Sequence, residues 1–288
     1  MGNHQRPGLS MKRASITASQ SFPPLLTIAL LFILLPQLSQ ASLVRICDDN
    51  AEWPPYTYYQ RDAGKIDKEK LSGATVELME EVFKEINLEF KIDLIPWKRC
   101  LKEVESFDVS KKYEVVINGS FNQQRHQFYY FSHPLYKTHS GIFYSAKKFS
   151  GRVPIHNVRD LNQYRLFGIS GYNYSPFIEA GVTRKIHTPV KNNSQAFKLL
   201  EQNRYDFFLS SVEPVYGSHA IMEHPIPDSI KSALVPGIKS FTFYLMISKT
   251  SPRAYELSTR INHALVKLKE NGTAEKIFKK YLPGGSGL

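Results

Sequence analysis

Apolar residues follow strand and helix spacings in turn along the first half of the chain. Residues 43–47 form a short apolar run, and residues 88–95 alternate apolar with polar side chains, so both segments predict strands. Between them, residues 73–86 place apolar side chains at helical spacing, and residues 97–104 do the same on one face. A further apolar run at 115–117 completes a strand–helix–strand–helix–strand order.

The same alternation returns in the second half of the chain. Apolar runs predict strands at 165–169, 205–209 and 241–247. Helical spacing predicts helices at 194–200, capped by Ser194, at 257–268, and around 277–278. Strands that alternate with helices in this way predict an α/β fold with mostly parallel sheets.

The N-terminal segment has the pattern of a secretory signal. Residues 1–41 contain Arg6, Lys12 and Arg13 but no acidic residue, followed by an apolar core at 25–35. Small residues then predict cleavage after Ala41. A membrane anchor is the rival interpretation, but the apolar core is only about half of the ~20 residues needed to span a bilayer. We therefore expect an exported, soluble and released protein.

Length and charge restrict the function classes. Met11 is an alternative start, because the basic pair after it still supplies the n-region. Cleavage after Ala41 leaves 247 of the 288 residues, enough for one large domain or two lobes of ordinary size. The formal net charge falls from +11 to +8, and the Lys and Arg residues are dispersed. The charge thus indicates a solvated surface, and export argues against a nucleic-acid partner.

Two cysteines remain in the mature chain. An even pair in an oxidising compartment predicts one disulfide, between Cys47 at the end of the first strand and Cys100 in the second helix. Two buried free thiols are the alternative.

The segment 117–125 has the composition of an anion-binding turn. The strand at 115–117 runs into Asn118-Gly119-Ser120, and Arg125 lies just beyond. Backbone N–H groups and a guanidinium that converge on one point suit a ligand carboxylate.

Taken together, five segments make the chain resemble the family 3 extracellular solute-binding proteins, the polar amino-acid receptors of bacterial ABC importers. The five segments are 43–56, with its Trp-Pro-Pro-Tyr, 71–78, 96–99, 118–136 and 249–281. The resemblance implies a type II periplasmic-binding fold, with two α/β lobes joined by two crossing strands.

The lobes implied by this resemblance hold a solute in the cleft between them. Lobe 1 would comprise residues 42–144 and 239–288, and lobe 2 residues 145–238, with crossings near Tyr144 and Lys239. Closure of the lobes about a hinge would trap the solute.

The resemblance also implies candidate ligand contacts. Arg125 would bind the ligand α-carboxylate, helped by backbone near Ser120, and is favoured over a surface arginine because a helix start disfavours an unpaired cation. Trp53 and Tyr56 are amphipathic rings that can form a cleft wall, or can simply pack on the sheet. Trp97 could equally serve the lobe core.

The contacts expected from lobe 2 are Tyr172, Asn173, Ser211 and Glu213. Tyr172 and Asn173 occupy the family's second anion-contacting loop. Family members commonly have an aspartate for the ligand ammonium where this chain has Ser211. Glu213, two positions on, would lie on the same strand face as Ser211 if the strand continued. Asp206 is expected to be structural.

The sequence thus predicts a monomeric periplasmic binding protein for a small carboxylate-bearing solute, with an amino acid as the leading choice. Its partner would be the inner-membrane permease of an ABC importer, and no cofactor or metal is expected. One alternative is a periplasmic sensing module with a membrane partner. The other is an enzyme such as a small-acid dehydratase, for which Glu213, Glu52 and His133 are the available acid–base groups. No nucleophile-elbow, Walker or zinc-protease motif is present in the sequence.

Overall fold

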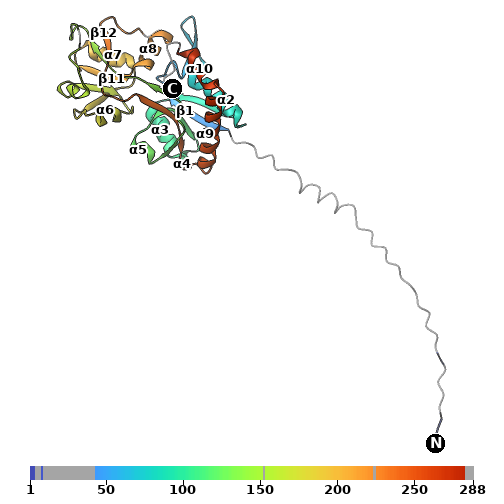
Figure 1. The fold of residues 1–288 in the computed structure, drawn as a ribbon. Coiled ribbons are helices and arrows are strands. Elements are labelled where there is room, and N and C mark those ends of the chain that lie inside the picture. Colours follow the sequence, from blue (N-terminus) through green and yellow to red (C-terminus); the bar gives the residue numbers. More distant parts are fainter. Residues whose placement is uncertain (4–7, 9–42, 152, 223–224, 283–288) are drawn as a thin grey trace. The chain divides into compact units, whose positions relative to one another are not determined.

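Two mixed β-sheets flanked by helices organise the chain (Figure 1). The structure, a computed structural model, describes residues 1–3, 8, 43–151, 153–222 and 225–282. The folded unit that we describe lies within residues 41–288. The predicted secretory signal at 1–41 falls almost entirely outside the described residues.

The first sheet contains the strands predicted at the start of the chain and one strand from its end. Its order is β4-β1-β5-β13-β6, with β7 also paired to β13. The strands are β1 (Val44–Asp49), β4 (Phe90–Ile95), β5 (Val115–Ser120), β6 (Tyr129–Phe131), β7 (Tyr136–Thr138) and β13 (Phe241–Ser248). β1 pairs in parallel with β4 and β5, as the βαβ pattern predicted, whereas β13 runs antiparallel to β5, β6 and β7.

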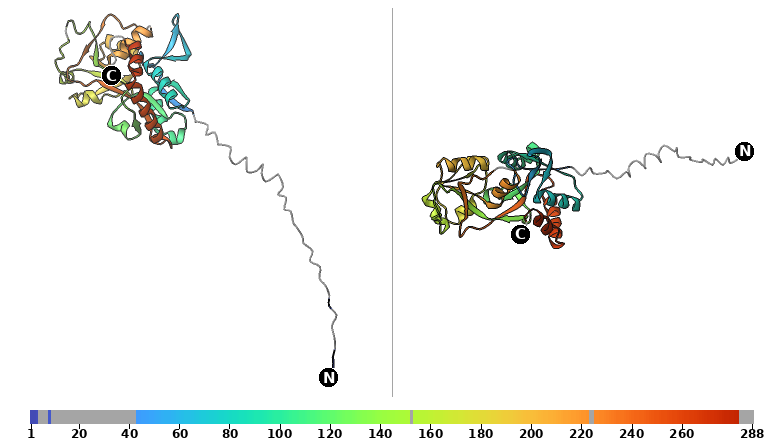
Figure 2. Two further views of the ribbon diagram at one scale, coloured as in Figure 1. Left: turned by 45° about the vertical axis from the view of Figure 1, so that its right-hand side comes forward. Right: turned by 90° about the horizontal axis from the view of Figure 1, so that it is seen from above.

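Helices cover both faces of the first sheet, and β1 contributes buried side chains to the core on each face. Ile46 belongs to the core that packs under α2 (Ala74–Glu85), α9 (Ala254–Glu270) and α10 (Thr273–Tyr281). These three helices contact one another and lie together in Figures 1 and 2. Cys47 belongs to the opposite core, which includes residues of α3 (Trp97–Glu105). The short helices α4 (Phe107–Ser110) and α5 (Gln123–His126) complete this part of the chain.

A disulfide ties α3 to the first sheet. It joins Cys47 of β1 to Cys100 of α3, with 5.7 Å between the Cα atoms. The predicted pairing is therefore confirmed, and both residues are fully buried.

The second sheet contains residues from the middle of the chain, in the order β10-β9-β11-β8-β12. Its strands are β8 (Ser140–Ser145), β9 (Leu166–Ile169), β10 (Ile186–Val190), β11 (Phe207–Ser211) and β12 (Ile230–Leu234). Its helical segments are η1 (Val158–Gln163), α6 (Ser175–Glu179), α7 (Asn193–Glu201) and α8 (Val212–Ile221). The three strands β10, β9 and β11 are parallel, and β8 runs antiparallel to β11 and β12.

The chain passes between the sheets twice. The first passage is at His139, between β7 and β8, and the return lies between Leu234 and Phe241. Tyr144, near which the first crossing was expected, lies inside β8 of the second sheet. The division into lobes stays a prediction, and the sheet membership of β8 favours a boundary at His139.

Two local features differ from the sequence interpretation. The cap of α7 is Asn192 and not Ser194, because the Asn192 side chain accepts the Gln195 N–H at 3.0 Å. An antiparallel hairpin, β2 (Tyr58–Asp62) with β3 (Lys65–Ser72), was not predicted and stands out from the first sheet in Figure 2. It is rich in charged residues and carries little apolar alternation, so its sequence gives a weak strand signal.

Asp206 ties two segments together at the start of β11. Its carboxylate accepts the Arg165 backbone N–H at 2.7 Å and the Arg165 Nη2 at 2.8 Å, and it also pairs with Lys148. These partners lower the pKa of Asp206 from 3.8 to about 2, despite an opposing effect of burial.

Replacement Asp206→Asn is expected to lower the free energy of unfolding by about 1–2 kcal/mol at neutral pH, since charge-assisted hydrogen bonds are lost. A lowered pKa gives stability that is present above pH 3.8 and is lost as the pH falls through about 2. Urea titrations from pH 7 downward should therefore show the two proteins converging. Asp228→Asn, at an exposed aspartate, is the matched control. An equal deficit at pH 7 and at pH 2.5 would contradict the ion-pair explanation.

Candidate ligand-binding site

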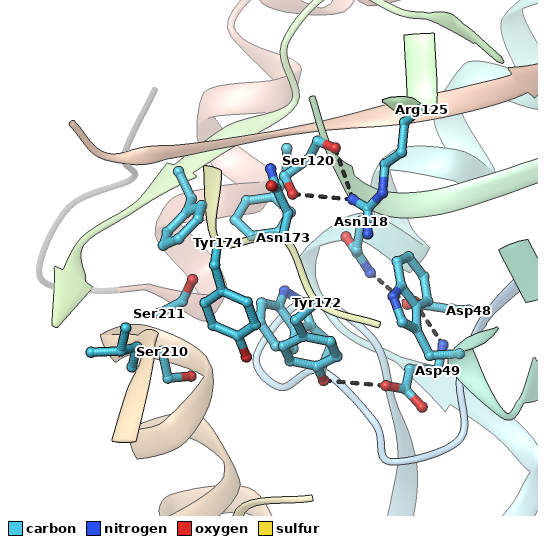
Figure 3. A pocket seen from close by; sticks show the side chains of 15 residues that line it. Asp48, Asp49, Asn118, Ser120, Arg125, Tyr172, Asn173, Tyr174, Ser210 and Ser211 are labelled. Carbon is cyan, nitrogen blue, oxygen red and sulfur yellow. Dashed lines mark hydrogen bonds between the residues drawn. The ribbon is translucent and has the colours of Figure 1, made fainter. Parts of the chain in front are cut away.

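A cavity of about 50 Å³ lies between the two sheets (Figure 3). It is lined from the first sheet and its helices by Asp48, Asp49, Trp53, Trp97, Asn118, Ser120, Arg125, Phe241 and Phe243, and from the second sheet and its loops by Tyr172, Asn173, Tyr174, Leu209, Ser210 and Ser211. The parallel strands β1, β5, β9 and β11 all point their carboxyl ends at or toward this cavity. In open α/β sheets, ligands bind at this edge.

Arg125 lies in the wall of the cavity with an exposed fraction of 7%. The Asn122 side chain caps α5 by accepting the Arg125 backbone N–H at 2.7 Å, which fixes the start of the arginine side chain. Its Nη1 donates to the Ser120 carbonyl at 2.8 Å and to Ser120 Oγ at 3.2 Å. Its Nη2 donates to the Gly171 carbonyl at 3.1 Å. The guanidinium is therefore held by neutral oxygens from both sheets.

Arg125 forms no ion pair with a carboxylate among the described residues. Burial lowers the pKa of Arg125 to about 10, so the side chain is still charged at neutral pH. A buried charge is stabilised when an opposite charge pairs with it. The cavity therefore presents a cation to which an anionic ligand is complementary.

Two aspartates at the end of β1 line the same cavity. Asp48 is 2% exposed, and its carboxylate accepts Asn118 Nδ2 at 2.6 Å and the Asp49 N–H at 2.8 Å. Burial raises the pKa of Asp48 to about 8 and also raises the pKa of Asp49. Asp49 accepts the Ala51 N–H at 3.0 Å and the Tyr172 hydroxyl at 3.2 Å. Neither aspartate pairs with a cation within the part of the chain that the structure describes.

Aromatic side chains form the walls around these polar groups. The Tyr172 ring meets Trp53 edge-on, with centroids 5.5 Å apart, and meets Trp97 edge-on at 6.4 Å. Both indole N–H groups are satisfied, Trp53 by the Tyr136 hydroxyl at 3.0 Å and Trp97 by the Gly171 carbonyl at 2.9 Å. The walls are thus rigid and largely apolar.

Hydrogen bonds join the two sides across the cavity. Asn173 Nδ2 donates to the Phe121 carbonyl at 2.8 Å, and Thr138 Oγ1 donates to Ser211 Oγ at 2.9 Å. Gly171 adopts φ +87°, and a Cβ at this position would lie 3.0 Å from atoms of Trp97 and Lys98. The loop that carries Tyr172 therefore approaches the first sheet closely because residue 171 is glycine.

Six of the eight ligand contacts predicted from the sequence line this cavity: Trp53, Ser120, Arg125, Tyr172, Asn173 and Ser211. Tyr56 and Glu213 do not. Tyr56 is fully buried in the core of the first sheet, where its ring stacks on Tyr136 at 3.8 Å.

Glu213 lies in the first turn of α8 and contacts His139, where the chain passes between the sheets. Its carboxylate accepts the backbone N–H of His139 at 2.9 and 3.1 Å and contacts the His139 ring nitrogen at 2.6 Å. The extended conformation assumed for residues 211–213 is wrong, because helix α8 begins at Val212. Ser211 and Glu213 therefore do not share a strand face.

Several lining residues were missed by the sequence interpretation: Asp48, Asp49, Asn118, Tyr174, Leu209, Ser210, Phe241 and Phe243. The two aspartates carried a usable signal, since they follow the first strand directly and carboxyl ends of parallel strands face one crevice. Phe241 and Phe243 carried none, because apolar residues in a strand predict only burial.

The acid–base groups considered for an enzyme lie elsewhere. Glu52 is paired with Arg61 at 2.7 Å, and Glu213 with His139. The backbone N–H of His133 donates to Asn262. None of the three residues lines the cavity.

Comparison with known proteins places the chain in a family. The profile of the bacterial extracellular solute-binding proteins, family 3, matches residues 44–284. The chain belongs to this family. Members of this family bind solutes, so this family 3 protein is a binding protein and not an enzyme. Among its described residues, no helix is long and apolar enough to cross a membrane.

Relatives of this family 3 protein are known from sequence and structure. The L-cystine-binding protein TcyA of Bacillus subtilis is 24% identical over 229 residues, which cover 80% of this chain and 77% of the relative. The arginine-, lysine-, histidine-binding protein ArtJ of Geobacillus stearothermophilus has a similar structure, with a TM-score of 0.65 and 18% identity over 84% of this chain and 96% of the other. A histidine kinase sensor domain matches with a TM-score of 0.64 and 17% identity, over 84% of this chain and 95% of the other. The predicted type II periplasmic-binding fold is confirmed by these similarities.

Proposed function

We propose that this family 3 protein captures an amino acid in the cavity between its two sheets and delivers it to an ABC importer. The observation that carries the proposal is Arg125, a buried guanidinium in the cavity wall without a carboxylate partner among the described residues. A ligand carboxylate supplies the missing charge and can accept two parallel hydrogen bonds from the guanidinium. Ser120 lies beside it and adds a hydroxyl to the same point.

The ammonium of the solute has a candidate acceptor in Asp49. This carboxylate lines the cavity and accepts hydrogen bonds from Ala51 and Tyr172, and a carboxylate can accept about four. A cation beside it also offsets the burial that raises its pKa. Ser211 offers only a hydroxyl, and Glu213 is engaged by His139. We therefore assign the role expected for Ser211 or Glu213 to Asp49.

Membership of the family supports a proposal for the partner and for the location. Relatives named as cystine-binding and as arginine-, lysine-, histidine-binding proteins support an amino acid as the solute. The partner is then the membrane permease of an importer, and the predicted secretory signal at 1–41 is the feature that supports export to the periplasm. The similarity to a kinase sensor domain keeps a sensing role as the alternative.

Calorimetric titration of the exported protein tests this proposal, after unfolding and refolding to remove any carried-over solute. The probes are L-alanine, propionate, which lacks the amine, and L-alaninamide, which lacks the carboxylate. Alanine is expected to bind and, at about 100 times its dissociation constant, to stabilise the fold by roughly 2.7 kcal/mol. Propionate and alaninamide are each expected to bind at least tenfold more weakly. Equal binding of alanine and propionate would exclude an amine acceptor, and no binding of alanine or of the larger L-leucine and L-arginine would contradict an amino acid as the solute.

A further inference from the structure

Tyr172 follows β9 of the second sheet, but its side chain contacts residues on the side of the first sheet. It lies in the loop after β9, and its hydroxyl donates to Asp49 Oδ2 at 3.2 Å (Figure 3). Its ring stands edge-on to both tryptophans, 5.5 Å from Trp53 and 6.4 Å from Trp97. An aromatic ring of the protein itself therefore fills the space between the two indoles at the acidic end of the cavity.

The space that remains is small. The cavity is about 50 Å³, whereas pockets for drug-sized ligands measure about 300–1,000 Å³. One water needs about 10–15 Å³, so the cavity holds only roughly three to five waters in this arrangement. A long side chain such as that of arginine does not fit beside Tyr172 in this arrangement.

The neighbours of Tyr172 hold its loop in place. The Gly171 carbonyl accepts from Trp97 Nε1 and from Arg125 Nη2. Asn173 donates to the Phe121 carbonyl and accepts the Ser175 N–H at 3.0 Å. Because residues on both sides of Tyr172 are tied by hydrogen bonds, the backbone of this loop cannot move away from the cavity without breaking contacts that also position Arg125.

We propose that Tyr172 is the specificity-determining residue of this site, and that its ring restricts the solute to the smallest amino acids. The inference rests on the proposed amino-acid function and adds the size class of the solute. A limit to the smallest amino acids distinguishes this chain from relatives whose names give cystine, or arginine, lysine and histidine, as their ligands. The ring sets the limit by volume, and the hydroxyl contributes only the contact with Asp49.

The test compares L-alanine, L-leucine and L-arginine as ligands of the wild type, Tyr172→Ala and Tyr172→Phe by calorimetric titration. The wild type is expected to bind alanine at least tenfold more tightly than leucine or arginine. Tyr172→Ala should raise the affinity for leucine and arginine at least tenfold, whereas Tyr172→Phe should keep the wild-type order. Tyr255→Ala is the matched control, since Tyr255 is 79% exposed and outside the cavity lining.

The outcomes separate this inference from the proposed function. If the wild type binds leucine or arginine as tightly as alanine, the size limit is wrong and the amino-acid function stands. If Tyr172→Ala binds alanine but gains nothing for the larger solutes, Tyr172 does not set the limit. If no protein in the series binds any of the three, the proposed function fails and the inference fails with it. Thermal unfolding of each empty variant verifies folding, and Tyr172→Ser repeats the test if the alanine variant does not fold.

Discussion

Replacement Arg125→Ala is expected to weaken binding of the carboxylate-bearing solute by about tenfold to a hundredfold, equivalent to roughly 1.5–3 kcal/mol. The guanidinium is buried in the cavity wall and bonded by Ser120 and Gly171, so its geometry is fixed before the ligand arrives. The loss should appear in calorimetric titration with L-alanine.

Two further variants sharpen the Arg125 result. Arg125→Lys keeps a positive charge but loses the planar fork, so it should restore only part of the affinity. Arg99→Ala removes an arginine of α3 whose side chain is 58% exposed, and it should leave binding unchanged. Wild-type affinity in Arg125→Ala would show that the carboxylate binds elsewhere.

Removal of the disulfide should lower the stability of the fold more than Asp206→Asn does. The double substitution Cys47→Ala with Cys100→Ala opens a loop of 53 residues, which in the chain-entropy model lowers the free energy of unfolding by about 4 kcal/mol. For a chain of this size we expect the melting temperature to fall by roughly 8–16 °C. Scanning calorimetry of the variant and of the wild type measures this fall.

Reduced wild type provides the control for the double variant. It should melt near the variant, since both lack the cross-link and differ only in two buried sulfur atoms. A melting temperature within about 2 °C of the oxidised wild type, for either protein, would show that α3 and β1 are held together without the bond. Because the loop between the cysteines carries Asp48, Asp49 and Trp97, solute affinity should fall together with stability.

Much of the fold was predictable because its signals are local. Alternation at 88–95 and helical spacing in 73–86 each depend on a few neighbouring residues, and both elements form as predicted. The pairing of Cys47 with Cys100 followed from a count of two cysteines in an exported chain. Arg125 stood out because a strand, a small-residue turn and a cation occur in one short segment.

The remaining site residues depended on information that the sequence does not carry locally. Tyr56 and Trp53 are both amphipathic rings beside Pro54-Pro55, and only the folded loop decides that Tyr56 stacks on Tyr136 while Trp53 lines the cavity. Glu213 was assigned by assuming that a strand continued past Ser211, where α8 in fact begins at the next residue. Asp48 and Asp49 could have been identified only by assuming that β1 ends at the ligand cavity.

The two tryptophans have a practical consequence. The chain contains only two, and both line the cavity. All indole fluorescence of the protein therefore originates at the site, without a background from other parts of the molecule. Entry of a solute that displaces water from Trp53 and Trp97 should change the emission maximum of the unlabelled protein, so occupancy can be followed in real time with its own intrinsic reporter.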